Sequence, residues 1–314
     1  MRIVYVMDPM ENVLPDKDTT YALQRATEAR GHQSLHCLPH DVFIKDGRAF
    51  ARCHEVTIEA HSPWFRMKSP SAVALDEVDC VFVRKDPPFD EAYLYLTLLL
   101  EVVRGKTLLL NDPAGLRSAN EKLYALHFGA FAPRMVVSAD RDVIHEFVRE
   151  CSGEAVIKPL HGAGGAGVLR LREGDDNKRS IVDTLTREGK TLAMVQEYLP
   201  AVRQGDKRIL LLDGAPLGAI NRVPRSDDLR SNIHVGGRVE PTTISKNERA
   251  IISAIAPRLH ADGLVFVGLD VIGEKLTEVN VTSPTGIQEL SRHEGRDRAT
   301  DVIAWIEQRA KAPK

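Results

Sequence analysis

The chain has 314 residues, a formal net charge of -2 and 43% hydrophobic residues. This length predicts two or three domains with enough apolar material for packed cores. The near-neutral charge argues against a nucleic-acid-binding protein, which usually has a basic face, and no apolar run approaches the roughly 20 residues of a membrane span. The four cysteines form no Cys-x-x-Cys pair, which favours reduced thiols in a cytoplasm over a metal cluster or a disulfide scaffold.

The first third of the chain alternates between short apolar runs and helical patterns. Strands are predicted at 3–7, 34–38, 78–84 and 107–111, and helices at 19–30 and 91–104. This alternation favours an open, mostly parallel α/β sheet, in which ligands bind at the carboxyl ends of the strands. The residues expected at that edge are Asp8, 84–86 and 111–112.

From residue 113 onward the pattern becomes a less regular mixture of helices and strands. Helices are predicted at 118–128, 141–150, 246–261 and 297–310. Strands are predicted at 155–159, 168–171, 192–198, 208–212, 217–222, 265–272 and 276–281. The turn at 273–275 suits a tight hairpin, so the last two strands are expected to pair antiparallel.

A glycine-rich turn at 162–167 separates two of the predicted strands. It matches the Gly-x-Gly-x-x-Gly of dinucleotide-binding proteins, but a helix follows that motif, whereas residues 168–172 alternate like a strand. The phosphate-binding loop of NTPases is absent too, since Val168 stands where its lysine should be. Two interpretations remain, a lid whose backbone N–H groups fold over nucleotide phosphates and an ordinary hairpin turn. The unbroken run of glycine and alanine after His161 favours the lid.

Three cationic side chains occur in or at the end of apolar strands. Lys158 precedes the glycine turn, and an ammonium group there is costly unless it meets an anion such as a triphosphate. The alternative is a surface lysine whose stem alone is buried. Arg208 and Arg222 occupy similar positions, and guanidinium groups bind carboxylate and phosphate with two parallel hydrogen bonds.

An acidic group near the C-terminus is the strongest local signal. Asp270 lies in an apolar strand, and Glu278 and Asn280 share one face of the next strand because they are two residues apart. The hairpin would bring Asp270 beside that pair. Two carboxylates and an amide oxygen suit Mg²⁺, which prefers hard oxygen ligands and bridges to phosphates. The alternative is a solvent-facing polar side of an antiparallel sheet.

Several motifs then follow in order from the first strand to about residue 290. They include Met7-Asp-Pro-Met10, Arg84-Lys-Asp-Pro-Pro-Phe-Asp90, Asn120-Glu-Lys122, Gly205-Asp-Lys-Arg208, Phe266-Val-Gly-Leu-Asp270 and Thr277-Glu-Val-Asn-Val-Thr-Ser-Pro284. Together they resemble the bacterial glutathione synthetases of the ATP-grasp superfamily. The resemblance implies an ATP-grasp fold of mixed α/β and α+β character. Its parts would be an N-terminal open parallel α/β domain (1–120), a central domain with the glycine-rich lid (121–200), and a C-terminal antiparallel-sheet domain (201–314).

The resemblance also implies roles for individual residues. ATP would contact Lys122, Lys158, Gly162, Gly164, Gly165, Gly167, Glu197, Tyr198, Leu199 and Asp206. The peptide substrate would lie against Arg84, Asp86, Arg222, Arg230, Asn232, Thr285 and Gly286. Two Mg²⁺ ions, for which Mn²⁺ can substitute, would be held by Asp270, Glu278 and Asn280. Arg208 and Lys158 would be the catalytic residues, with Arg208 stabilising charge on the transferring phosphoryl group.

The implied reaction joins γ-glutamylcysteine to glycine through an acyl phosphate, with ADP and phosphate as the other products. The sequence departs from the family pattern at His161, His234, Gly286 and Gln288. An ATP-grasp ligase that joins a γ-glutamyl peptide or another carboxylate to a different amine is therefore the alternative. A nucleotide-binding regulator without catalysis is less favoured, because the acidic group and both lysines are intact. The family also implies a cytoplasmic homo-oligomer, a dimer or tetramer, without nucleic-acid or membrane partners.

Overall fold

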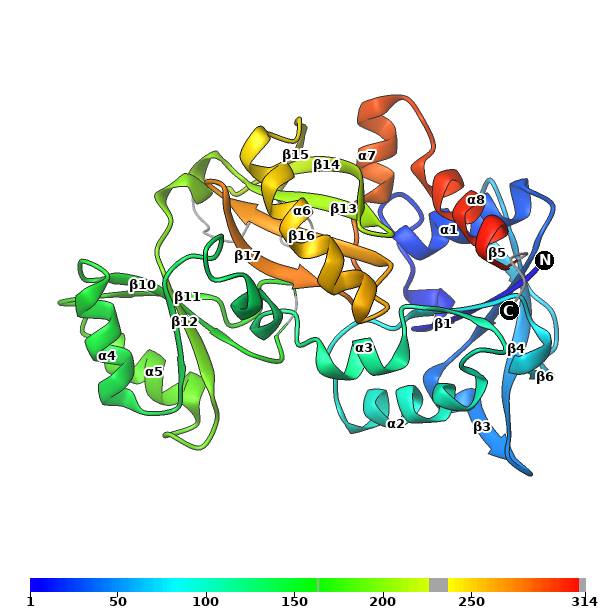
Figure 1. Cartoon of the computed structure of the whole chain (residues 1–314), viewed down its shortest axis with the longest axis horizontal. Coiled ribbons are helices and arrows are strands. Elements are labelled where there is room, and N and C mark those ends of the chain that lie inside the picture. The colour runs from blue at the N-terminus through cyan, green and yellow to red at the C-terminus, as the bar shows by residue number, and fades with distance from the viewer. Residues whose placement is uncertain (163, 226–236, 311–314) are drawn as a thin grey trace.

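The computed structural model describes residues 1–162, 164–225 and 237–310 of the chain. Three β-sheets follow one another along the sequence, and helices pack on each of them (Figure 1). Two residues assigned to substrate binding, Arg230 and Asn232, and the departure at His234 lie outside the described residues. None of the described helices is both long enough and apolar enough to cross a lipid bilayer.

The first sheet is built around four parallel strands. Its order is β3-β4-β2-β1-β7-β8, with β5 and β6 paired to β4. The strands β2, β1, β7 and β8 run parallel, which confirms the open parallel sheet predicted from the alternating pattern. The antiparallel strands on the β4 side of this sheet are not predicted from the sequence, because charged residues interrupt the apolar pattern of that segment. The strands are β1 (Arg2–Met7), β2 (Gln33–Cys37), β3 (Val42–Lys45), β4 (Arg48–Ile58), β5 (Phe65–Met67), β6 (Ser71–Ala74), β7 (Cys80–Arg84) and β8 (Leu108–Leu110).

Helices cover both faces of this sheet because successive residues of a strand point to opposite sides. Ile3 and Tyr5 of β1 belong to a core that contains residues of α1 and α8. Val4 and Val6 belong to a second core that contains residues of α2. The helices are α1 (Thr19–Ala29), α2 (Glu91–Leu100), α3 (Pro113–Ser118) and α8 (Arg298–Ala310).

The helix α8 returns from the far end of the described chain to the N-terminal sheet, where it lies beside α1 (Figure 1). The side chain of Ile303 is fully buried in the core that α8 shares with this sheet. At the surface, Arg30 donates to both carboxylate oxygens of Glu307, at 2.8 and 2.7 Å. A helix that belongs by sequence to the range 201–314 therefore packs with elements of the range 1–120.

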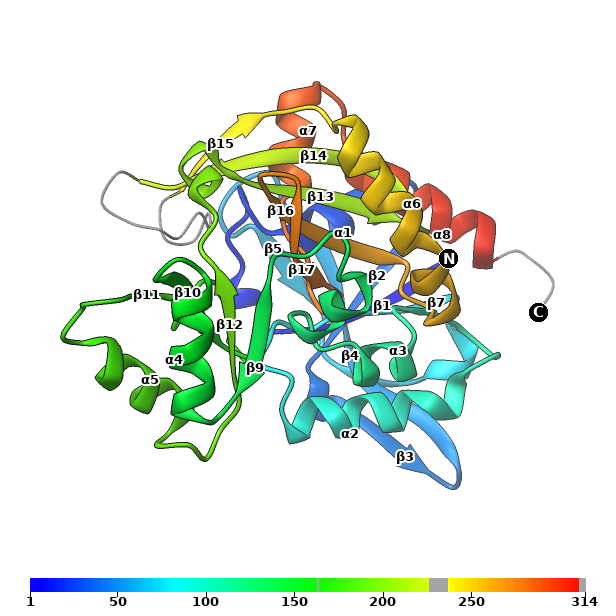
Figure 2. The same ribbon diagram turned by 60° about the vertical axis from the view of Figure 1, so that its left-hand side comes forward.

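The middle sheet is small and antiparallel, with the order β11-β10-β12-β9. Its strands are β9 (Met135–Ser138), β10 (Glu154–Pro159), β11 (Leu169–Arg172) and β12 (Ala193–Glu197). The helices α4 (Arg141–Glu150) and α5 (Lys178–Thr186) cover its outer face, away from β16 and β17 (Figure 2). Their fully buried Ile144 and Val182 pack with Ile157 and Val195 of the strands. The antiparallel pair β10–β11 confirms that a strand, not a helix, follows the glycine-rich turn.

The C-terminal sheet is also antiparallel, with the order β15-β14-β13-β16-β17. Its strands are β13 (Asp206–Leu212), β14 (Ala215–Val223), β15 (Arg238–Pro241), β16 (Phe266–Ile272) and β17 (Lys275–Asn280). The helices of this part are α6 (Lys246–Ala261) and α7 (Ile287–Glu294). A capping box starts α6, since Ser245 accepts from the backbone of Glu248 while the Glu248 carboxylate accepts from the backbone of Ser245. The predicted bounds of α6 agree with the structure.

The helix predicted at 118–128 is wrong. Instead α3 ends at Ser118, and a separate 3-10 helix covers Leu123–Phe128. The break arises at Asn120, whose side-chain oxygen accepts from the backbone N–H groups of Lys122 and Leu123, at 3.1 and 3.0 Å. Asparagine competes in this way with backbone hydrogen bonding and starts a new turn. Lys122 therefore lies between the two helices and not on the surface of a single long one.

Ile303→Ala should lower the free energy of unfolding by about 2 to 5 kcal/mol, because truncation leaves a cavity between α8 and the N-terminal sheet. Urea denaturation of the purified protein measures the change. The control is Val143→Ala on α4, where the native side chain is 42% exposed and the expected change is within about 0.5 kcal/mol. Equal effects of the two variants would show that α8 contributes little to the N-terminal core.

Candidate functional site

A cavity of about 460 Å³ is lined by residues of the middle and C-terminal sheets and by the loops beside them. Most residues proposed for ATP, metal or substrate line it. These are Asp86, Lys122, Lys158, Gly162, Gly164, Gly165, Glu197, Tyr198, Leu199, Asp206, Arg208, Arg222, Asp270, Glu278, Asn280 and Thr285. Segments more than 150 residues apart in sequence thus meet in one place.

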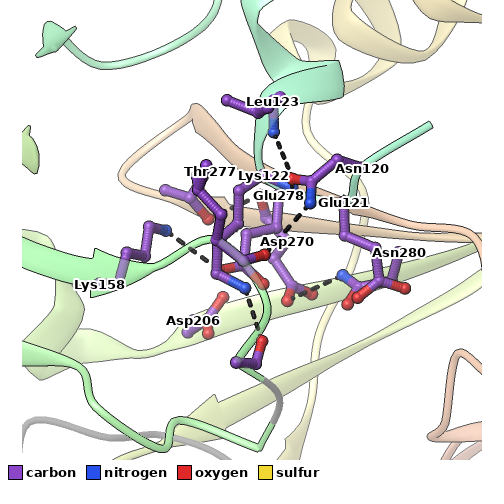
Figure 3. A network of polar contacts seen from close by, with 12 residues as sticks. Asn120, Glu121, Lys122, Leu123, Lys158, Asp206, Asp270, Thr277, Glu278 and Asn280 are labelled. Carbon is purple, nitrogen blue, oxygen red and sulfur yellow. Dashed lines mark hydrogen bonds and ion pairs between the residues drawn. The ribbon is translucent and has the colours of Figure 1, made fainter. Parts of the chain in front are cut away.

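The acidic group converges as the hairpin predicted. Asp270 in β16 lies directly opposite Glu278 in β17, and Asn280 Nδ2 donates to Asp270 Oδ2 at 3.1 Å (Figure 3). No group of three or more His, Cys, Asp or Glu side chains within the described ranges is placed to hold a metal ion. The present set has two carboxylates and one amide instead. Such hard oxygen donors suit Mg²⁺ when phosphate oxygens complete the coordination.

Two buried guanidinium groups hold the Asp270 carboxylate. Arg208 donates to both of its oxygens, at 2.5 and 2.9 Å, and Arg222 Nη2 lies 2.9 Å from Oδ1. Arg222 also pairs with Asp206 at 2.7 Å. Burial by itself raises the pKa of Asp270, but the charges and hydrogen bonds of the two arginines outweigh it and hold this pKa well below its usual range. The two arginines therefore favour the ionised form of Asp270.

Two lysines hold the Glu278 carboxylate in a similar way (Figure 3). Lys158 Nζ lies 3.0 Å from Glu278 Oε1 and Lys122 Nζ lies 4.0 Å from the same atom. Lys122 also donates to the backbone oxygen of Gly162 at 2.7 Å, which ties it to the glycine-rich turn. Burial raises the pKa of Glu278, but attraction to the two ammonium groups leaves the net shift downward. The cations proposed for phosphate binding thus already neutralise the carboxylates proposed for metal binding.

Part of the cavity lining is apolar. Val156, Val202 and Ile272 contribute to it, beside the segment 197–199 at the end of β12. The guanidinium group of Arg170 lies 3.9 Å from the centre of the Tyr198 ring and fixes its orientation. Apolar walls beside an exposed backbone segment suit a flat aromatic base.

Three residues proposed for binding do not line the cavity: Arg84, Gly167 and Gly286. Arg84 is buried, donates to Thr20 Oγ1 and to the backbone oxygen of Pro284, both at 3.0 Å, and has a pKa lowered by burial. It therefore anchors the loop that leads to Thr285. Gly286 has a φ of 116°, and a Cβ there would lie 2.9 Å from Ile220 Cδ1. The backbone conformation and this close approach therefore favour glycine at the position.

The structure adds cavity residues that the sequence did not single out, including Glu121, Gln196, Thr282 and Ser283. Gln196 could have been predicted as a cavity residue, because it is two residues from Tyr198 and so shares a strand face with it. Glu121 is adjacent to Lys122 in the Asn-Glu-Lys motif, but its direction depends on the chain break at Asn120. That break is visible only in the fold.

Family comparisons match the two halves of this architecture. The family model of the prokaryotic glutathione synthetase N-terminal domain matches residues 1–117, and that of its ATP-grasp domain matches residues 121–295. The chain belongs to the prokaryotic glutathione synthetase family. It is 44% identical to a glutathione synthetase of Synechocystis sp. over 98% of this chain and 99% of that protein. It is 41% identical to one of Mesorhizobium japonicum over 96% of each.

Solved structures share the fold at much lower sequence identity. D-cycloserine synthetase superposes with a TM-score of 0.66 and 17% identity, covering 98% of this chain and all of that one. An ATP-grasp protein with a RimK domain from Sphaerobacter thermophilus gives 0.63 and 18%, covering 97% and 99%. An ATP-grasp ligase solved with Mg and ADP gives 0.65 and 18%, covering 98% of both chains. These structural similarities confirm the ATP-grasp fold that the sequence predicted for this chain.

Asp270→Asn should lower the free energy of unfolding at neutral pH by about 3 to 5 kcal/mol, because two buried guanidinium groups lose a shared carboxylate. A depressed pKa stabilises the folded state above the unfolded pKa of about 3.9. The loss in free energy of unfolding relative to wild type should therefore be complete above that pH. It should become smaller as the pH falls toward the lower pKa of the folded state.

Urea denaturation at a series of pH values, without nucleotide, measures this difference. The matched control is Asp86→Asn, since Asp86 is exposed and its side chain forms no ion pair with the described residues. Its expected change is within about 0.5 kcal/mol. A pH-independent loss in Asp270→Asn would contradict an ionic origin.

Proposed function

We propose that this chain is an ATP-dependent ligase that joins γ-glutamylcysteine to glycine and releases glutathione, ADP and phosphate. The supporting observation is the 44% identity to a glutathione synthetase over nearly the full length of both chains. The cavity agrees with this activity in its chemistry. It combines buried cations, a cluster of carboxylates and an apolar wall, as a nucleotide and two charged substrates require.

The reaction needs a leaving group on a carboxylate. The γ-phosphoryl group of ATP passes to an oxygen of the cysteinyl carboxylate, and the bond to ADP breaks. The ammonium group of glycine loses a proton to solvent, and the free amine then forms a C–N bond to the acyl carbon. Phosphate leaves with the electrons of the C–O bond, and the nitrogen gives up a second proton. Arg208 and Lys158 are proposed to neutralise charge on the transferring group, because positioning and charge stabilisation dominate this chemistry.

The cations are placed to exchange partners when nucleotide binds. Lys122 and Lys158 pair with Glu278, and Arg208 pairs with Asp270, in the described structure. Phosphate oxygens would take over these cations, and Asp270, Glu278 and Asn280 would then hold two Mg²⁺ ions. Mg²⁺ held there would supply positive charge next to the phosphate oxygens. Charge balance is kept in both states, which limits the rearrangement needed.

The glycine-rich turn is proposed to close over the phosphates. Gly164 and Gly165 have φ values of 62° and 80°, and both line the cavity. A Cβ at Gly164 would meet no heavy atom within 4 Å, so there is open space beside this residue, whereas a Cβ at Gly167 would lie 3.6 Å from Leu185 Cδ2. A cover at this place would keep water from the acyl phosphate.

The alternative function, ligation to a different amine, was suggested by departures from the family pattern. Three of these, His161, Gly286 and Gln288, do not line the cavity. Gln288 donates to the backbone oxygens of Pro15 and Asp18, at 3.0 and 2.6 Å, and so serves the packing of α7. The positions of these three residues therefore give no support to a different amine.

The assembly and location of the protein are further proposals. Family membership supports a homo-oligomer with small-molecule substrates as its other partners. All four cysteines are free thiols in the structure, which agrees with a reducing cytoplasm.

Purified protein with ATP, Mg²⁺, γ-glutamylcysteine and glycine should release phosphate only when both substrates are present, and should form a product with the mass of glutathione. A phosphate assay and mass spectrometry measure the two. β-Alanine and serine in place of glycine form the comparison. Ligation of either of these with no product from glycine would reject the proposed amine and leave the ATP-grasp chemistry in place.

Glu278→Gln should lower kcat roughly a hundredfold or more, because metal ions supply several kcal/mol of charge stabilisation in such transfers. Mn²⁺ binding to the ADP complex, followed by electron paramagnetic resonance, should weaken as well. Glu91→Gln is the matched control, since Glu91 bonds only Tyr95 on the surface of α2. Unchanged Mn²⁺ binding in Glu278→Gln would remove Glu278 from the metal site.

A further inference from the structure

Glu121 lines the cavity next to Lys122 but has none of the roles proposed above. Its Oε1 atom accepts from the backbone N–H groups of Val281 and Thr282, both at 3.2 Å, and from Thr282 Oγ1 at 2.7 Å. Its backbone oxygen accepts from Val279 at 2.9 Å. The side chain is therefore fixed against the loop that follows β17.

The second carboxylate oxygen of Glu121 has no partner among the described residues. Within residues 1–162, 164–225 and 237–310, Oε2 forms no hydrogen bond, and no lysine, arginine or histidine lies within 4.0 Å of the carboxylate. The neighbouring Lys122 turns its ammonium group to Gly162 and Glu278 instead. Oε2 is also not among the fully buried unpaired atoms, so it is open to the cavity.

Glu121 differs in this respect from three other acidic residues that line the cavity. Asp206, Asp270 and Glu278 are each paired with an arginine or a lysine. Burial raises the pKa of Glu121, although hydrogen bonds from Thr282 act in the opposite direction. A partly buried carboxylate without a counter-ion gains stability when a cation enters the cavity beside it.

Glycine, the amine in the proposed function, brings such a cation. Its amino group is an ammonium ion at neutral pH and must reach the acyl carbon near the phosphate-binding residues. Glu121 lies on the Asn280 side of the polar network, away from Lys158 (Figure 3). Thr282 and Ser283, which follow in the loop that Glu121 holds, also line the cavity and offer hydroxyl groups.

We propose that Glu121 binds the ammonium group of the amine substrate through Oε2 and so contributes to the affinity for that substrate. The inference rests on the proposed ligase function. Mg²⁺ is the competing cation for the same oxygen. The ammonium ion fits better, because Oε1 is already committed to three donors and Asp270, Glu278 and Asn280 are the hard ligands that converge on each other.

Glu121→Gln separates these interpretations, because the carboxamide oxygen can still accept the three hydrogen bonds that Oε1 accepts. The KM for glycine should rise about tenfold to a hundredfold, the range for loss of a charge-assisted hydrogen bond. Hydroxylamine, which is largely uncharged at neutral pH, should still trap the acyl phosphate as a hydroxamate at the wild-type rate. The Mg²⁺ concentration for half-maximal hydroxamate formation should also be unchanged.

Glu121→Asp keeps the charge on a shorter side chain and should give an intermediate KM for glycine. Glu91→Gln on the surface of α2 is the control and should leave all three quantities as in wild type. The melting temperature of each variant reports on folding, and the ratio of glycine to hydroxylamine turnover does not depend on the folded fraction.

Equal losses with glycine and hydroxylamine would overturn this inference and make Glu121 a positioning residue for the loop after β17. A shifted Mg²⁺ requirement with an unchanged KM for glycine would overturn it in favour of a metal ligand. Absence of both hydroxamate with hydroxylamine and glutathione with glycine, from wild-type protein with ATP, Mg²⁺ and γ-glutamylcysteine, would reject the proposed function, and this inference with it.

Discussion

The buried carboxylate of Asp270, shared between Arg208 and Arg222, is the interaction on which the site depends. It joins β16 to both β13 and β14, so the centre of the C-terminal sheet has an ionic bond across three strands. Such a group is costly to bury and is favourable only when every partner is present. The sheet therefore fixes the positions of the charges before any ligand arrives.

The same arrangement is extended outward by residues near the ends of strands in the other two sheets. Lys158 comes from the middle sheet, and Arg84 of the N-terminal sheet holds Pro284, next to the cavity residue Thr285. Arg208 also donates to the backbone oxygen of Thr285. All three sheets thus contribute to one charged network, and a change in any of them alters the geometry at the phosphate-binding end.

The sequence predicted those parts of the fold and site that local pattern determines. The parallel strands, α4, α6 and the hairpin carrying Asp270, Glu278 and Asn280 follow from periodicity and turn residues. The strand order, the return of α8 and the break at Asn120 depend on contacts between distant segments, which leave little local signal. For the same reason Arg84 was assigned to the substrate, whereas its direction toward Pro284 became clear only in the fold.

The position of α8 affects how the protein is made on the ribosome. One face of the N-terminal sheet is completed by a helix that begins at Arg298, after the middle and C-terminal sheets have been synthesised. Domains usually fold in order as they emerge, but this one keeps an apolar surface open during most of translation. Its nascent form is thus the stage at which binding by a chaperone or loss by aggregation would be greatest.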